Sequence, residues 1–243
     1  MIDRITDWVK QQVEGAGAKG CVFGLSGGLD SSVVGALCKK AFPESSLGLL
    51  LPCFSRGEDL KHARKVAEAF FIKTKLIDLG PAFDQFYIQL EGKVYDKKDM
   101  NLAIANLKPR LRMISLYYQA NKFNYLVVGT GNRSEAAMGY CTKYGDAGVD
   151  LLPLAHLLKS QVRELARELN VPAGIIKKPP SAGLWSGQTD EDEMGITYND
   201  LDKIIIGLEN NELKGLDPRL VEKVKKTMAA SRHKRCVPPA FKP

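Results

Sequence analysis

The sequence contains no apolar run that approaches the roughly 20 residues of a membrane-spanning helix. Its opening residues, MIDRITDWVKQQVE, are amphipathic and lack the basic and then apolar pattern of a secretory signal peptide. Internal repeats, low-complexity stretches and clear linkers are missing as well. From these absences we expect a cytoplasmic protein that uses no membrane, built as one domain over residues 1–243.

Cysteine is scarce. The five cysteines are scattered, odd in number and never spaced as CxxC: Cys21, Cys38, Cys53, Cys141 and Cys236. This pattern favours neither a disulfide framework nor a zinc site. We interpret the cysteines as small buried or surface side chains in a reducing compartment.

Acidic residues are the minority among the charged ones, with 28 Asp and Glu against 35 Lys and Arg and a net charge of +7. A positive surplus suits polyanionic ligands, either nucleotides or nucleic acid. Solubility alone explains such a surplus equally well, so the charge does not choose between these partners.

What the sequence does contain is an alternation of strand and helix signals. Four short apolar runs have the length of buried strands: residues 20–25, 46–52, 75–79 and 125–130. The segments between them carry apolar residues at helical spacing. The alternation predicts an α/β fold, with a doubly wound parallel sheet flanked by helices. A helical C-terminal part should follow, in which Thr197 and Asp217 cap helices.

A glycine- and serine-rich segment, SGGLDSS at residues 26–32, lies between the first expected strand and the next helix. Glycines let the backbone turn tightly and bring its N–H groups near a ligand, and the helix start adds donors. The segment is neither a Walker A loop, because GK[ST] is missing, nor GxGxxG. Asp30 would repel bare phosphate, but its carboxylate suits Mg²⁺ held against phosphate oxygens. We therefore predict a pyrophosphate-binding loop rather than an ordinary glycine turn.

This loop resembles the SGGxDS loop of the ATP pyrophosphatases, which share the adenine nucleotide alpha-hydrolase-like fold and cleave ATP between its α- and β-phosphates. Further segments resemble those of the NAD synthetases within that superfamily: NLKPRLRM at 106–113, GTGNRSE at 129–135, TKYGD at 142–146, KPPSAGLW at 178–185, GQTDEDE at 187–193 and HKR at 233–235. They follow the family's order from about residue 20 to residue 240. Gly183 departs from the family, which often has aspartate there, and residues 84–100 carry no motif that we can assign.

The resemblance implies an ammonia-dependent ligase that completes NAD biosynthesis. The carboxylate of deamido-NAD would attack the α-phosphorus of ATP and release pyrophosphate. Ammonia would then attack the acyl-adenylate, giving NAD and AMP. ATP would be a co-substrate and Mg²⁺ a cofactor. The family's homodimeric state is implied in the same way.

The resemblance also implies roles for single residues. Asp30 and Lys159 would be catalytic, and Asp30 with Glu135 would bind Mg²⁺. The implied ATP contacts are Gly24, Leu25, Ser26, Gly27, Gly28, Leu29, Asp30, Ser31, Thr130, Lys159 and Ser181. The implied deamido-NAD contacts are Arg110, Lys143, Asp150, His233 and Lys234. No general base is assigned.

Several of these residues have a plainer explanation. Glu135 also suits the first turn of a helix, where a carboxylate interacts well with the helix dipole. Lys159 also suits a solvated charge, and His233 with Lys234 a basic surface cluster. We interpret the acidic run at 190–193 as a solvated loop or a lid.

Three other functions stay open. The nearest is another ATP-pyrophosphatase amidotransferase, against which TKYGD and the HKR segment argue. An RNA-binding, tRNA-modifying enzyme would suit the charge but usually carries extra domains or CxxC pairs, so we expect no nucleic-acid partner. A silent nucleotide-binding subunit is disfavoured by Asp30 and Glu135. Because only about 20 residues precede the first strand, we expect no glutamine-hydrolysing domain and therefore free ammonia or a separate donor protein.

Overall fold

The computed structural model describes residues 1–55, 57–96, 98–99, 101–181, 183 and 187–241. Leu184 and Trp185, which belong to the KPPSAGLW segment, lie outside the described residues. Within the described part of the chain, no helix combines the length and the apolar character needed to cross a membrane.

The centre of the fold is a parallel four-stranded sheet in the order β3-β2-β1-β4. Its strands are β1 (Gly20–Gly24), β2 (Ser46–Leu50), β3 (Thr74–Leu76) and β4 (Tyr125–Val127). Each overlaps one of the four apolar runs, so the predicted parallel sheet is confirmed. The first strand lies next to the last, which brings the segments after β1 and β4 to the same edge of the sheet.

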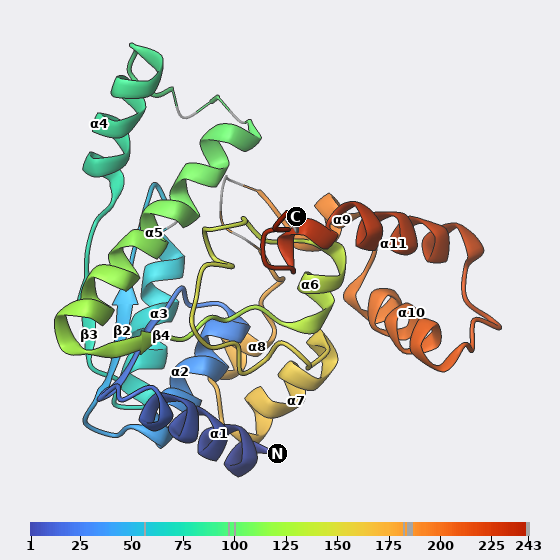
Figure 1. Ribbon diagram of the computed structural model, residues 1–243, viewed down its shortest axis with the longest axis horizontal. Helices are drawn as coiled ribbons and strands as arrows, with labels where there is room; N and C mark the ends of the chain where they lie inside the picture. The colour runs from blue at the N-terminus through green and yellow to red at the C-terminus, as the bar shows by residue number, and fades with distance from the viewer. Residues whose placement is uncertain (56, 97, 100, 182, 184–186, 242–243) are drawn as a thin grey trace.

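Helices cover both faces of the sheet (Figure 1). One face packs against α1 (Ile2–Gly15), α2 (Leu29–Ala41), α3 (Gly57–Ala69), α7 (Lys159–Glu168) and α8 (Ala173–Ile176). The other face packs against α4 (Gly80–Glu91) and α5 (Leu102–Phe123). Side chains of β1 alternate between the two cores, Cys21 and Phe23 in one and Val22 in the other, as the pleat requires. The sheet is thus doubly wound, as predicted.

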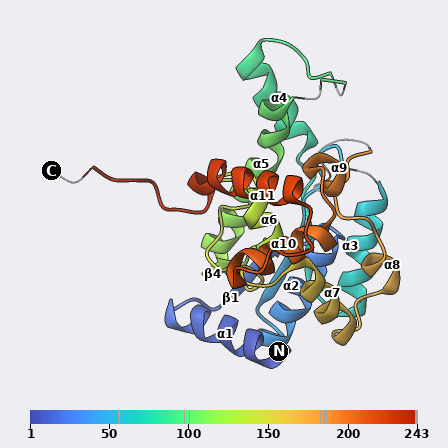
Figure 2. The ribbon, with the colours of Figure 1, turned by 90° about the vertical axis from the view of Figure 1, so that its right-hand side faces the viewer.

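A helical part follows the sheet in the second half of the chain. It consists of α6 (Arg133–Met138), α9 (Asp190–Met194), α10 (Tyr198–Asn210), α11 (Pro218–Ala230) and the 3₁₀ turn η1 (Arg232–Lys234). Apolar residues of α6, α10 and α11 form its separate core. Thr197 and Asp217 cap α10 and α11 by accepting from backbone N–H groups, so both predicted caps are confirmed. Beyond η1 the chain runs outward as an extended segment (Figure 2).

Candidate active site

The loop after β1 is shaped by Gly27. Its φ of +78° lies in the left-handed region, and a Cβ there would lie 2.4 Å from the backbone oxygen of Asp59 in α3. The serines hold the turn, since Ser26 Oγ and Ser31 Oγ lie 3.0 Å apart and Ser32 Oγ donates to the Gly28 carbonyl at 2.6 Å. The loop is therefore closed by its own hydrogen bonds and by α3 beneath it.

The start of α2 completes an anion-binding surface. Gly28 is the N-cap residue, and no side chain in the described structure caps this helix end. The N–H groups of the first turn have no partner within the helix and carry its positive dipole end. Backbone donors thus point out of the loop where phosphate oxygens are expected to bind.

We expect Gly27→Ala to lower the free energy of unfolding by at least about 2 kcal/mol, because alanine is strained at this φ and its Cβ meets the backbone of α3. Gly28→Ala is the matched control, since its φ is −88° and its Cβ would have Ser26 Oγ at 3.4 Å as its nearest neighbour. Urea denaturation of the two variants measures the difference. Equal stabilities would contradict this account of the loop.

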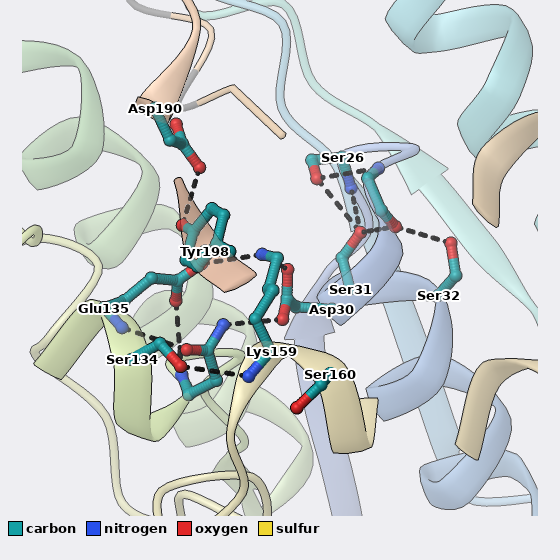
Figure 3. A network of polar contacts seen from close by, with 12 residues as sticks. Ser26, Asp30, Ser31, Ser32, Ser134, Glu135, Lys159, Ser160, Asp190 and Tyr198 are labelled. Atoms are coloured by element: carbon teal, nitrogen blue, oxygen red, sulfur yellow. Dashed lines mark hydrogen bonds and ion pairs between the residues drawn. The ribbon is translucent and has the colours of Figure 1, made fainter. Parts of the chain in front are cut away.

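Three charged side chains meet beside the loop (Figure 3). Asp30 lies in the first turn of α2, Glu135 in the first turn of α6, and Lys159 is the first residue of α7. Lys159 Nζ lies 2.6 Å from Asp30 Oδ2 and 3.0 Å from Glu135 Oε1. Lys159 is only 1% exposed, so it is not the solvated charge of the plainer explanation.

Asn132 joins the two carboxylates, and sequence reasoning gave it no role. Its Nδ2 donates to Asp30 Oδ1 at 2.8 Å. Its Oδ1 accepts from the Glu135 N–H at 3.0 Å, and Glu135 Oε2 accepts from the Asn132 N–H at 3.2 Å. This reciprocal capping box was visible in the sequence as Asn followed three residues later by Glu. Glu135 therefore has both roles weighed for it, a first-turn carboxylate and a member of the cluster.

Burial dominates the electrostatics of the cluster. Burial and the Asp30 charge raise the pKa of Glu135 to about 7, against the opposing effect of Lys159. Burial alone would lower the pKa of Lys159, but Asp30 and Glu135 outweigh it and raise the pKa above its ordinary value. The cluster thus holds a permanent cation between two carboxylates.

The same donor set fits a divalent cation. The carboxylates of Asp30 and Glu135 both contact the Lys159 ammonium. A Mg²⁺ ion near that position would meet carboxylate oxygens, which are the ligands it prefers. The described residues contain no group of three or more His, Cys, Asp or Glu side chains that could hold a metal. The protein would therefore supply two ligands, and phosphate and water oxygens the rest.

The raised pKa of Glu135 makes stability depend on pH. Because this pKa is higher in the folded protein than the ordinary value of 4.5, the contribution is complete below about pH 4.5 and is lost as the pH rises through about 7. We expect the free energy of unfolding without metal to fall by up to roughly 3 kcal/mol across this range. Urea denaturation at several pH values measures the fall. It should flatten in Glu135→Gln, and an equal fall in that variant would refute the assignment to Glu135.

Lys159 also contacts the helical part, and this contact was not predicted from the sequence. Lys159 Nζ lies 4.8 Å from the centre of the Tyr198 ring, and Tyr198 OH donates to Asp190 Oδ2 at 3.0 Å. Asp190 is 3% exposed and begins α9, so the expectation of a solvated loop at 190–193 is wrong for this residue. Asp190 is held in the interior by Tyr198, a buried partner 8 residues along the chain, and not by its acidic neighbours.

The other predicted ATP contacts have few interactions of their own. Thr130 is half-buried in the segment between β4 and α6, on the same edge of the sheet as the loop. Ser181 is exposed, and its Oγ accepts from the Gly183 N–H at 3.1 Å. Gly183 has a φ of +63°, and a Cβ there would lie 4.0 Å from Asp59 Oδ2.

Two of the predicted deamido-NAD contacts lie together. Arg110 is exposed on α5, and its Nη2 donates to the carbonyl of Lys143 at 3.4 Å. Arg112, two residues further along α5, instead donates to the Leu51 carbonyl at 3.1 Å and to Ser55 Oγ at 3.3 Å. Arg112 therefore ties α5 to the segment after β2.

The remaining predicted contacts have intramolecular partners. Asp150 accepts from the Val127 N–H at 2.8 Å and from Tyr117 OH at 2.9 Å. Lys234 Nζ donates to the carbonyls of Gly139 at 2.7 Å and Cys141 at 2.9 Å. His233 is exposed in η1. Within the part of the chain that the structure describes, none of these three residues forms a hydrogen bond or ion pair with Asp30, Glu135 or Lys159.

A parallel sheet, a glycine loop leading into a helix start, and two carboxylates beside a buried lysine define an α/β protein whose loop is suited to the phosphates of a nucleotide. The family model described as NAD synthase matches residues 1–238. The NH(3)-dependent NAD(+) synthetase of Carboxydothermus hydrogenoformans is 46% identical over 236 residues, which cover 97% of this chain and 94% of that protein. The chain therefore belongs to the NAD synthase family, which is a family of ligases.

Solved structures agree with this assignment. The NMN synthetase of Francisella tularensis has a TM-score of 0.89 and 37% identity, covering 100% of this chain and 96% of that one. The NH3-dependent NAD synthetase of Campylobacter jejuni has a TM-score of 0.83 and 29% identity, covering 99% and 97%. The fold of this chain is thus shared over nearly the full length of both solved structures.

Proposed function

We propose that this protein amidates deamido-NAD with ammonia at the expense of ATP, giving NAD, AMP and pyrophosphate. The observation that carries the proposal is the Asp30–Lys159–Glu135 cluster beside the phosphate loop. It is supported by the 46% identity to an NH(3)-dependent NAD(+) synthetase over 97% of the chain.

The reaction needs activation of a carboxylate, because its oxygen is a poor leaving group toward ammonia. In the proposed first step a carboxylate oxygen of deamido-NAD bonds to the α-phosphorus and the bond to pyrophosphate breaks. In the second, ammonia bonds to the acyl carbon, AMP leaves with the former carboxylate oxygen, and a proton is lost from nitrogen. Such phosphoryl transfer depends chiefly on positioning and charge neutralisation.

The residues of the site suit those needs. We assign residues 24–31 to the ATP phosphates, with Thr130 and Ser181 as further ATP contacts. Lys159 would neutralise charge on the phosphates, since its buried ammonium is held at a fixed point. Asp30 and Glu135 would hold Mg²⁺, which when bound would withdraw charge from the phosphate oxygens. Lys159 would then exchange its carboxylate partners for phosphate oxygens.

The substrate side of the site is assigned to Arg110, Lys143, Asp150, His233 and Lys234. Arg110 has an exposed guanidinium next to Lys143, a suitable pair for a dinucleotide's phosphates. Asp150 and Lys234 are held by backbone groups, so each would present a fixed rather than a mobile charge.

We further propose a cytoplasmic homodimer. The apolar face of α10 contributes Leu201, Ile204 and Ile205 to a buried core. On α5, by contrast, Ile114 is 58% and Tyr118 64% exposed, which leaves apolar surface for a second copy. Light scattering at several concentrations tests this, and a mass that stays at 26.8 kDa would remove the dimer.

Turnover is tested with ATP, Mg²⁺, deamido-NAD and ammonium, following NAD. We expect NAD to form and to disappear when ammonium is omitted, because a relative that is 46% identical to this chain is an NH(3)-dependent NAD(+) synthetase. Nicotinate mononucleotide belongs in a parallel assay because a similar structure is an NMN synthetase. A higher kcat/KM for the mononucleotide would show that it, and not deamido-NAD, is the acyl substrate. If neither compound gives a product, the proposal is overturned.

A further inference from the structure

Helix α7, which begins with Lys159, has one capping contact from its own sequence, in which Gln161 Oε1 accepts from the Leu158 N–H at 2.9 Å. The residue before it is Leu158, whose side chain cannot accept a hydrogen bond. The first N–H groups of the helix are instead satisfied from outside. The Lys159 N–H donates to Ser134 Oγ at 3.0 Å, and the Ser160 N–H donates to Asp202 Oδ2 at 2.9 Å.

Asp202 joins these two contacts. Ser134 Oγ donates to Asp202 Oδ1 at 2.5 Å, so one carboxylate of α10 reaches the first turns of both α6 and α7. Asp202 is 5% exposed and Ser134 is fully buried. Each contact residue is the chain neighbour of a member of the charged cluster, Ser134 of Glu135 and Ser160 of Lys159.

The carboxylate of Asp202 is stabilised without a cationic side chain. Among the described residues it forms no salt bridge with Lys, Arg or His. Its negative charge is stabilised instead by the Ser134 hydroxyl, by the Ser160 N–H and by the positive dipole ends of α6 and α7. A buried carboxylate with such partners is sensitive to the placement of both helix ends, because moving either leaves it unsatisfied.

We infer that Asp202 is a positioning residue: through Ser134 it fixes the first turns of α6 and α7 and thereby the spacing between Glu135 and Lys159. This inference rests on the proposed function, because that spacing matters for turnover only if the cluster acts on ATP. Small displacements of a charged group from its working geometry cost about 100-fold in rate.

The test compares Asp202→Ala with Asp200→Ala. Asp200 lies on the same helix, and its carboxylate accepts from Thr197 Oγ1 at 2.8 Å in a solvent-exposed contact. We expect Asp202→Ala to lower kcat per folded molecule about 100-fold and to leave KM for deamido-NAD nearly unchanged. Asp200→Ala should keep its kcat. A lower melting temperature in Asp202→Ala with kcat within about twofold of the parent would show a purely structural role and overturn the inference.

Two further variants keep the test decisive if Asp202→Ala folds poorly. Asp202→Asn retains an acceptor for the Ser160 N–H, so its kcat should fall between those of the parent and Asp202→Ala. Combining Ser134→Ala with Asp202→Asn should cost less than the product of the single losses, because both act through one path. Fully multiplicative losses would contradict a shared path.

Amide hydrogen exchange separates this inference from the proposed function. Residues 156–164 should exchange faster in Asp202→Ala than in Asp200→Ala, because α7 loses its cap. If the parent makes no NAD, the proposed function fails, while faster exchange would still establish the cap. If exchange is unchanged, Asp202 does not hold α7 and the positioning role fails whatever the turnover.

Discussion

Replacing Asp30 with asparagine is expected to lower kcat at least about 1,000-fold while the protein stays folded. The variant keeps the size of the side chain and an acceptor for Asn132 Nδ2, but it removes the charge that Lys159 and the proposed Mg²⁺ require. Steady-state NAD formation measures the loss, and circular dichroism with a thermal melt checks the fold.

The control for Asp30→Asn is Asp7→Asn, which makes the same change at an exposed position of α1. Its turnover should equal that of the parent. Near-normal turnover in Asp30→Asn would remove Asp30 from the metal and catalytic assignments. Unfolding of the variant would shift its role to stability, since Lys159 would then depend on both carboxylates to remain buried.

Replacing Lys159 with methionine is expected to change turnover and metal binding in opposite directions. Turnover should fall about 100-fold or more, because the phosphates lose a fixed cation. Binding of Mn²⁺ without nucleotide should become tighter, because the ammonium that lies 2.6 and 3.0 Å from the two carboxylates is gone. Isothermal titration with Mn²⁺ measures the second effect independently of activity.

The Lys159→Met variant should also lose about 3 kcal/mol of stability in the absence of metal, since two partly buried carboxylates are left without their cation. Added Mn²⁺ should restore much of that loss. Lys203→Met, an exposed lysine on α10, is the control. Weaker Mn²⁺ binding in Lys159→Met would show that the ammonium does not share its place with a metal.

Local patterns in the sequence were enough to predict the sheet and the loop. The strands β1, β2 and β4 lie in short apolar runs, and Asp30 follows the first of them within a glycine turn, so its place at the carboxyl end needs no long-range information. The caps of α10 and α11 were predicted for the same reason, because a cap side chain and the backbone N–H that donates to it lie within three residues.

Contacts between distant segments could not be derived in this way. Lys159 was named by resemblance, but its pairing with Asp30 spans 129 residues and its burial follows from packing of α7 against α2 and α10. Asp202 lies 68 residues from Ser134, and nothing in its local sequence distinguishes it from Asp200. Asp190 was misjudged because an acidic run usually faces water, whereas Tyr198 holds this one in the interior.

The central claim is that the acyl carboxylate attacks the α-phosphorus of ATP, and an oxygen label tests it most directly. Deamido-NAD labelled with ¹⁸O in both carboxylate oxygens is incubated with the protein, ATP, Mg²⁺ and ammonium. The ¹⁸O content of each product is then measured by mass spectrometry. The account predicts one labelled oxygen in AMP and one in the amide of NAD, with pyrophosphate unlabelled. Label in inorganic phosphate, with ADP as the nucleotide product, would place the attack at the γ-phosphorus and contradict it.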